Sequence, residues 1–166
     1  MKIHIIGPSG SGKTYLSQKL SEKTGIPCTS LDELLWDNSS AVSNTKRDPE
    51  ERDQMLRSVL QQDNWIVEGV QHAWVGSGFE KADTIYLLEP PALLCRIRNI
   101  RRFVKRKLNG TGRKHETFRS LINLLKWTKK FYRMNLPEIH EKLQPYQHKV
   151  IRITNKRELR QVLQEM

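Results

Sequence analysis

The sequence predicts an α/β fold in which a mostly parallel β-sheet is covered by helices on both faces. A chain of 166 residues is long enough to bury a substantial core and has the usual size of one domain, so we expect a single domain over residues 1–166. Short apolar segments typical of strands alternate along the chain with segments whose apolar residues recur at helical spacing. This alternation favours crossover connections, which make neighbouring strands parallel.

The strands are predicted from short apolar runs that are bounded by turn residues. The first run ends at Gly7, and the strongest buried-strand pattern ends at Pro90. Glu68 and Gly69 are expected to break the third strand. The predicted strands are residues 2–6, 28–31, 65–67, 84–88 and 149–153.

The helices are predicted from helical spacing and from their start and stop residues. The first, residues 13–23, is stopped by Gly25 and Pro27. The second begins at Asp48, an N-cap residue followed by a proline, and runs to about residue 62. Three further helices are predicted after Pro91, around residues 118–125 and at residues 156–164.

Polar and glycine-containing stretches are predicted to separate these elements. Residues 37–46 are interpreted as a mobile loop and the stretch around Gly76 and Gly78 as a turn. Residues 109–112, Asn-Gly-Thr-Gly, are interpreted as a flexible interruption between two helices.

The charge of the chain is concentrated in one segment. With 29 Lys and Arg against 18 Asp and Glu, the net charge is +11, which suggests a polyanionic partner such as nucleotide phosphates, nucleic acid or an anionic surface. Residues 96–133 hold 14 basic residues and one acid, Glu116, for a net +13, and the other residues sum to −2. The segment is either a functional basic surface or a solvated helical face.

Composition excludes several classes of protein. No apolar run approaches the roughly 20 residues of a spanning helix, so we expect neither a spanning segment nor a membrane partner. The first residues lack a signal-peptide pattern, so we expect a cytoplasmic protein. Cys28 and Cys95 are far apart and in no CxxC pair, which favours reduced thiols over a disulfide scaffold or a zinc site. The oligomeric state cannot be derived from the sequence.

A phosphate-binding loop is the most specific motif in the chain. It fits G-x-x-x-x-G-K-[ST] and lies between a predicted strand and a predicted helix, where backbone N–H groups and the helix N-terminus would face phosphates. Lys13 would reach the β- and γ-phosphates of ATP, and the Thr14 hydroxyl would bind Mg²⁺. The alternative is a glycine-rich turn without a ligand. The loop residues are Gly7, Pro8, Ser9, Gly10, Ser11, Gly12, Lys13 and Thr14.

Three further motifs resemble one family. Leu31-Asp32-x-Leu-x-Trp36, Trp65-Ile-Val-Glu68-Gly69 and Ala82-Asp83-Thr84, together with the phosphate loop, are similar to small adenylate-kinase-related proteins known as DNA topology modulation proteins. The resemblance spans nearly the whole chain. It implies a three-layer, nucleotide-kinase-like P-loop NTPase fold with a five-stranded parallel sheet in the order 2-3-1-4-5. It also implies a basic helical lid at about residues 99–134.

The resemblance and the strand ends together indicate candidate catalytic residues. By the resemblance, Arg98 would cover the adenine and Arg102 would contact the phosphates. Asp32 and Glu68 lie at strand ends beside the phosphate loop, where Asp32 could orient or deprotonate an acceptor hydroxyl and Glu68 could hold a metal-bound water. For both carboxylates the alternative is a helix cap or a surface position. Trp36 would either wall an acceptor pocket or belong to the core.

The chain departs from the family at the expected acceptor site. Val70 and Gln71 stand where relatives carry Asn-Tyr, and Gly78 stands where they carry an Arg. The lost amide and the lost guanidinium leave the acceptor undefined. His72 could contribute to an altered site or be a bystander.

Two functional hypotheses follow. The first is an ATP-dependent kinase acting on a small nucleoside, nucleotide or hydroxyl-bearing acceptor. The alternative is a nucleic-acid-associated NTPase that binds DNA through residues 96–133. In that case Trp127, Phe131 and Tyr132 would either stack on bases or complete the apolar face of their helix. A GTPase is disfavoured because the chain has no N-K-x-D sequence.

Overall fold

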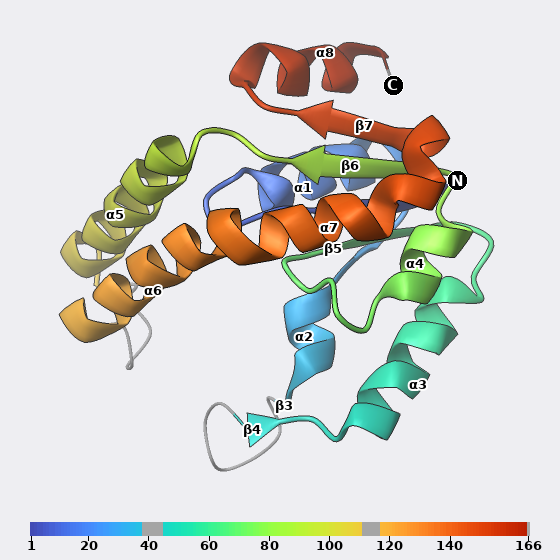
Figure 1. Cartoon of the computed structure of the whole chain (residues 1–166), viewed down its shortest axis with the longest axis horizontal. Helices are drawn as coiled ribbons and strands as arrows, with labels where there is room; N and C mark the ends of the chain where they lie inside the picture. The colour runs from blue at the N-terminus through green and yellow to red at the C-terminus, as the bar shows by residue number, and fades with distance from the viewer. Residues whose placement is uncertain (38–44, 111–116, 166) are drawn as a thin grey trace.

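A five-stranded parallel sheet forms the centre of the computed structural model, which describes residues 1–37, 45–110 and 117–165 (Figure 1). Its strands run in the order β2-β5-β1-β6-β7, and each neighbouring pair is parallel. Counted along the chain this is the order 2-3-1-4-5, so the predicted fold class and strand order are confirmed. The strands are β1 (Lys2–Ile6), β2 (Cys28–Ser30), β5 (Trp65–Gly69), β6 (Thr84–Leu88) and β7 (Val150–Ile153).

Helices cover both faces of the sheet (Figure 1). Those on one face are α1 (Lys13–Thr24) and α8 (Lys156–Glu165). Those on the other face are α2 (Leu31–Leu35), α3 (Pro49–Leu60), α4 (Gly76–Lys81), a π-helix (Phe131–Asn135) and α7 (Leu136–Leu143), followed by a 3-10 helix (Gln144–Lys149). Helices α5 (Ala92–Leu108) and α6 (Phe118–Lys130) lie side by side at one end of the sheet.

Strand alternation divides the buried side chains into two cores. In β6, Ile85 and Leu87 face the α2, α3, α4 and α7 layer, whereas Tyr86 and Leu88 face α1 and α8. Such alternation is what a sheet covered on both faces requires, because successive side chains of a strand point to opposite sides. Trp65 is among the largest fully buried side chains.

Several predicted boundaries were wrong. Leu31 begins helix α2 instead of ending a strand, because Leu31 and Leu34 are both buried on one side of that helix. Glu68 and Gly69 continue β5 instead of breaking it, since both pair with the end of β1. The turn predicted around Gly76 and Gly78 is helix α4, whose Phe79 anchors it in the core.

Two predicted loops lie partly outside the described residues. The described ends of the predicted loop 37–46 are not loop, because they form a short hairpin of β3 (Trp36–Asp37) and β4 (Thr45–Lys46). Residues 38–44 lie outside the description. The predicted interruption 109–112 begins where α5 ends, and residues 111–116 are also outside it. The helical run 131–149 was missed by the sequence analysis.

A buried histidine explains the glycine at position 78. His4 on β1 is fully buried against Phe79, with ring centroids 4.6 Å apart, and neither ring nitrogen has a hydrogen-bond partner among the described residues. Burial lowers the pKa of His4 from 6.5 to about 3, so the ring is neutral at physiological pH. A Cβ at Gly78 would lie 2.8 Å from His4 Nδ1. The His4 ring therefore excludes a larger side chain, including the expected Arg, from position 78.

We expect Gly78→Ala to destabilise the protein by about 1–3 kcal/mol, because the added methyl must displace a buried ring. Gly76→Ala is the matched control: it lies in the same helix, a Cβ there meets nothing within 4 Å, and alanine favours helix, so we expect unchanged or slightly higher stability. Urea unfolding followed by circular dichroism measures both variants. Equal stability of the two would contradict this packing argument.

Within the described residues, no helix is both long enough and apolar enough to cross a bilayer. Both cysteines are free thiols, with Cys95 buried and Cys28 partly buried.

Candidate active site

The phosphate loop joins the end of β1 to the start of α1 as the motif predicts. Gly10 and Gly12 have φ angles of 82° and 109°, a left-handed backbone that favours glycine. A Cβ at Gly10 would also lie 2.6 Å from the carbonyl oxygen of Cys95 on α5, so the loop packs directly against that helix. Glycines at these positions allow the loop to curl in front of the α1 N-terminus, where the helix dipole favours an anion.

Lys13 is buried at the first position of α1. Its side chain is 7% exposed, and its Nζ donates a hydrogen bond to the carbonyl oxygen of Pro8 at 3.0 Å. Burial lowers the pKa of Lys13, and the carboxylates of Glu68 and Asp32 oppose this effect. The ammonium group therefore lies at the loop, where the charges of both carboxylates act on it.

Thr14 and Glu68 meet at the same edge of the sheet. Thr14 Oγ1 donates to Glu68 Oε1 at 3.4 Å, and Glu68 is only 8% exposed. Burial raises the pKa of Glu68, Lys13 lowers it in part, and Asp32 raises it further. A hydroxyl beside a buried carboxylate, next to a phosphate loop, is a donor set suited to Mg²⁺, which prefers oxygen ligands and commonly shares them with substrate phosphates.

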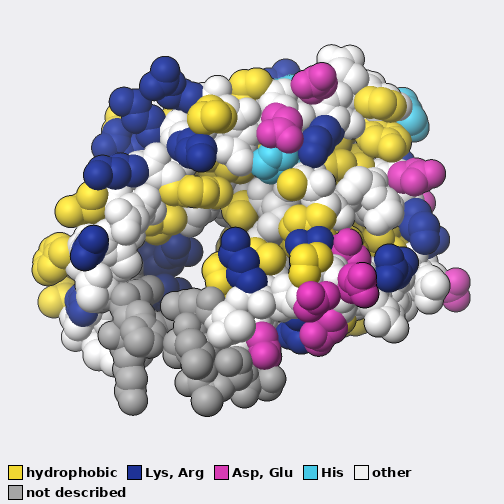
Figure 2. Space-filling view, turned by 60° about the horizontal axis from the view of Figure 1, so that its bottom comes forward, with side chains coloured by type: hydrophobic (Ala, Val, Ile, Leu, Met, Phe, Trp, Pro, Cys, Tyr) yellow, Lys and Arg dark blue, Asp and Glu magenta, His cyan; other side chains and the backbone are white. Residues whose placement is uncertain are grey.

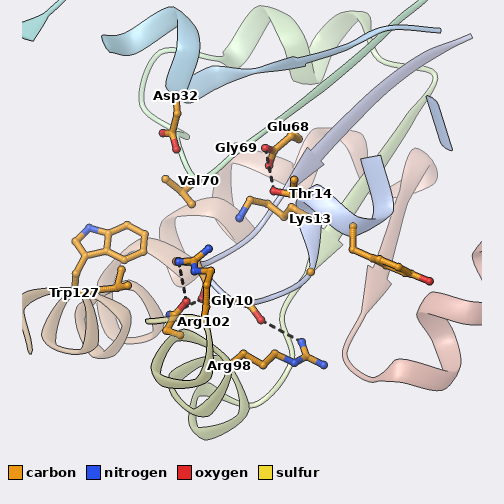
Figure 3. A pocket seen from close by; sticks show the side chains of 15 residues that line it. Gly10, Lys13, Thr14, Asp32, Glu68, Gly69, Val70, Arg98, Arg102 and Trp127 are labelled. Atoms are coloured by element: carbon orange, nitrogen blue, oxygen red, sulfur yellow. Dashed lines mark hydrogen bonds between the residues drawn. The ribbon is translucent and has the colours of Figure 1, made fainter. Parts of the chain in front are cut away.

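Two arginines of helix α5, one helical turn apart, hydrogen-bond to the phosphate loop. Arg98 Nη1 donates to the carbonyl oxygens of Gly10 and Ser11, both at 3.1 Å. Arg102 Nη2 donates to Ser9 Oγ and to Asn99 Oδ1, both at 3.2 Å. Both predicted arginines thus lie at the loop, on either side of it (Figure 3).

Asn99 was missed by the sequence analysis. It is 1% exposed, its Nδ2 donates to the Ser9 carbonyl at 3.2 Å, and its Oδ1 accepts from Ser9 Oγ at 3.2 Å. Its position between Arg98 and Arg102 on the buried face of α5 is the only signal that could have indicated it, because an amide on an otherwise apolar face needs a partner.

Asp32 is held by an amide from the neighbouring strand end. Gln71 Nε2 donates to Asp32 Oδ1 at 2.6 Å, and Gln71 Oε1 accepts from the Val70 backbone N–H at 3.0 Å. A Cβ at Gly69 would lie 2.4 Å from Gln71 Oε1, so glycine there leaves room for the folded-back side chain. The resemblance described above implied a lost amide at position 70, and Gln71 brings an amide to this site.

One cavity of about 440 Å³ collects nearly all the predicted site residues (Figure 3). Lys13, Thr14, Asp32, Glu68, Arg98 and Arg102 line it, together with Val70, Leu124 and Trp127. It borders a wider cleft of about 790 Å³ that also contains Trp36, Glu33 and Arg106. Trp36 therefore lies in a cleft wall and not in the core.

A second cavity of about 460 Å³ lies on the other side of the loop. Ser11, Gly12 and Arg98 line it together with Asn155, Leu159 and Arg160 at the start of α8. Arg98 is thus shared between the two cavities. His72 lines neither: its Nε2 lies 3.1 Å from Glu138 Oε2 on α7, which makes it a structural contact.

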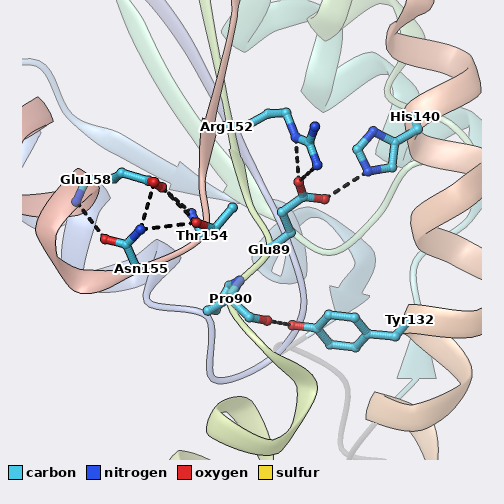
Figure 4. A network of polar contacts seen from close by, with 8 residues as sticks. All are labelled: Glu89, Pro90, Tyr132, His140, Arg152, Thr154, Asn155 and Glu158. Carbon is cyan, nitrogen blue, oxygen red and sulfur yellow. Dashed lines mark hydrogen bonds and ion pairs between the residues drawn. The ribbon is translucent and has the colours of Figure 1, made fainter.

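A polar network fixes the end of β6 to α7 and β7 (Figure 4). Glu89 is bonded to His140 Nε2 at 2.8 Å and forms an ion pair with Arg152. Tyr132 donates its hydroxyl to the Pro90 carbonyl oxygen. Of the two readings of Phe131, the structure supports the apolar one, because its ring is fully buried in the core.

No protein-family model matches the chain, and no curated protein sequence matches it. Solved structures share its fold over nearly its whole length. A shikimate kinase from Acinetobacter baumannii in complex with shikimate is 17% identical, with a TM-score of 0.60 over 99% of this chain and 89% of that one. A gluconokinase from Sinorhizobium meliloti 1021 is 15% identical, with a TM-score of 0.56 over 99% and 87%. A deoxyadenosine kinase from M. mycoides with bound dATP is 14% identical, with a TM-score of 0.50 over 99% and 98%.

Proposed function

We propose that this chain is a kinase that transfers the γ-phosphoryl group of ATP to a hydroxyl of a small acceptor. One observation carries the proposal: a single cavity is lined by Lys13, Arg102, Glu68 and Asp32. The two cations could bind the phosphates of ATP, and a carboxylate beside them could accept the proton of an acceptor hydroxyl. The fold adds support, since the similar structures are kinases of shikimate, gluconate and deoxyadenosine.

The loop residues fit ATP and Mg²⁺. Lys13 would exchange its bond to Pro8 for the β- and γ-phosphates, and Arg102 would bind the same phosphates from α5. Thr14 would ligate Mg²⁺ directly and Glu68 through water. When bound, the metal neutralises charge on the β- and γ-phosphates. Arg98 would cover the adenine from its place in the second cavity.

Asp32 is the group that would act on the acceptor. It would accept the proton of the acceptor hydroxyl as that oxygen bonds to the γ-phosphorus, while the bond to the β-phosphate oxygen breaks and ADP leaves. Gln71 holds the Asp32 carboxylate in place through a 2.6 Å hydrogen bond. Lys13 and Arg102 would stabilise the charge that spreads over the transferred group.

The predicted lid, about residues 99–134, contributes four residues to the cavity: Asn99, Arg102, Leu124 and Trp127. Residues 111–116 of this range lie outside the described part of the chain. We propose that the described helices of this range, α5 and α6, cover the phosphates during transfer and exclude water, which would otherwise compete as the acceptor.

The nucleic-acid alternative and the resemblance to topology modulation proteins stay predictions from the sequence. Three aromatic side chains were candidates for stacking on bases. In the structure Phe131 is buried, Tyr132 is hydrogen-bonded to Pro90, and Trp127 lines the cavity. The basic charge alone is compatible with any polyanion.

An ATP-consumption screen tests the proposal. Purified protein with ATP and Mg²⁺ is offered nucleosides, nucleotides, sugar acids and small alcohols, and ADP formation is measured. We expect one class of hydroxyl acceptor to raise ADP formation well above the rate without acceptor, and the product to carry a phosphate ester by mass spectrometry. If every acceptor leaves only slow hydrolysis, the kinase proposal fails.

A further inference from the structure

The outer face of α5 carries an apolar stripe that points away from the core. Leu93, Ile97, Ile100, Val104 and Leu108 recur every three or four residues, so they share one face of the helix. Their exposed fractions run from 39% to 80%. The buried residues of the same helix, Cys95, Asn99 and Phe103, lie on the opposite face. Helix α5 therefore has a second apolar face, which is exposed to solvent.

Helix α6 adds two exposed apolar side chains at the same end of the molecule. Phe118 is 75% exposed and Ile122 51%, and Phe118 stacks edge-on against Phe103 of α5 with ring centroids 5.3 Å apart. Seven of the eleven large hydrophobic side chains that are exposed in the described part of the chain belong to these two helices. Single exposed apolar residues need no explanation, but a row of five on one face of α5 indicates an interaction surface.

Basic residues flank the stripe on both sides. On the helical wheel of α5, Arg96 and Lys107 lie along one side of it and Arg101 and Lys105 along the other. The two helices together contain eleven Lys and Arg and no Asp or Glu. Figure 2 shows basic and hydrophobic side chains together at this end of the molecule, on the left, and acidic side chains elsewhere.

We propose that the outer faces of α5 and α6 bind an anionic lipid bilayer. The apolar stripe would enter the boundary between headgroups and acyl chains, and the flanking Lys and Arg would contact headgroup phosphates. The five stripe residues span about 22 Å along the helix axis, enough for α5 to lie in the plane of the membrane surface. The contact would be peripheral, and this proposal departs from our sequence-based expectation of no membrane partner.

Charge and composition favour lipid over the other occupants. A second copy of this chain that met the surface symmetrically would place one basic helix against another, with no acid on either helix to compensate. A nucleic acid would match the positive charge, but its phosphate backbone provides no apolar surface for a row of Leu, Ile and Val side chains to pack against. An anionic bilayer supplies both an apolar layer and negative charge in one plane.

Vesicle sedimentation with the full chain tests the proposal. We expect binding to vesicles of phosphatidylcholine mixed with phosphatidylglycerol and little binding to phosphatidylcholine alone. Ile97→Ser combined with Val104→Ser should weaken binding to the mixed vesicles about tenfold or more, and Arg101→Gln combined with Lys105→Gln by a similar factor. Ile151→Ser, an equally exposed isoleucine on β7, is the matched control and should bind as the unmodified chain does.

The outcomes separate insertion from plain attraction to polyanions. If the Ile97 and Val104 variant binds as well as the unmodified chain, only charge is at work, as for nucleic acid, and the proposal is overturned. Absence of binding to the mixed vesicles overturns it as well. All four substituted side chains are exposed and outside the candidate active site, so thermal melting should show an unchanged fold.

Discussion

Lys13→Ala is expected to reduce ATP binding below detection by titration calorimetry. Lys13 is the buried cation at the start of α1, and no other described lysine lines the cavity of about 440 Å³ that also contains Asp32 and Glu68. Truncating one partner of a buried charge pair costs about 2–5 kcal/mol, which corresponds to a loss of affinity of at least about thirtyfold. Because the phosphates carry most of the charge of ATP, we expect the loss to be similar for ADP and ATP.

Two controls make the Lys13 result interpretable. Lys13→Met keeps most of the side-chain volume and removes the charge, so it should lose binding without leaving a cavity. Lys19→Ala removes an exposed lysine of the same helix and should bind ATP normally. ATP affinity that stays unchanged in both Lys13 variants would contradict the assignment of residues 7–14 as the phosphate site.

Asp32→Asn is expected to lower the rate of phosphoryl transfer by about 10²–10⁴-fold, with ATP affinity unchanged. Asparagine is nearly the same shape and can still accept the bond from Gln71, but it cannot take the proton of the acceptor hydroxyl. Single-turnover kinetics with an acceptor from the screen, together with calorimetry for ATP, separate the chemical step from binding.

Glu33→Gln is the matched control for Asp32. Glu33 is the next residue of α2 and lines the wider cleft but not the smaller cavity that holds Lys13. We expect a change of only a few-fold, if any. If both substitutions slow transfer equally, Asp32 acts through the general negative charge of the cleft. In that case its proposed role as the base is wrong, even where the kinase activity itself stands.

The sequence predicted the phosphate loop and the strand order well, for different reasons. The loop is a local feature, because its eight consecutive residues contain both the glycines for the turn and the side chains for the phosphates. The strand order came from a family resemblance, and the structure confirms it. The predicted boundaries at Leu31, Glu68 and Gly76 were wrong because they were based on local residue preferences. In the structure these boundaries depend on which side chains are buried.

The candidate site shows the same division. Lys13, Asp32, Glu68, Arg98 and Arg102 were expected near one another, and one cavity contains all five. The partners that hold them could not be predicted. Gly78 was interpreted as the loss of an arginine. In the structure a side chain at this position would collide with the buried ring of His4.

The sequence by itself determined the α/β class and the phosphate loop, because these depend on residues that are neighbours along the chain. Only the tertiary structure decided which side chains complete the site. Gln71 reaches Asp32 across 39 positions, and Asn99 reaches Ser9 across 90. Contacts of this kind form when strand ends and helix α5 are brought to one edge of a packed sheet, and their geometry depends on burial and shape, which a local pattern does not contain.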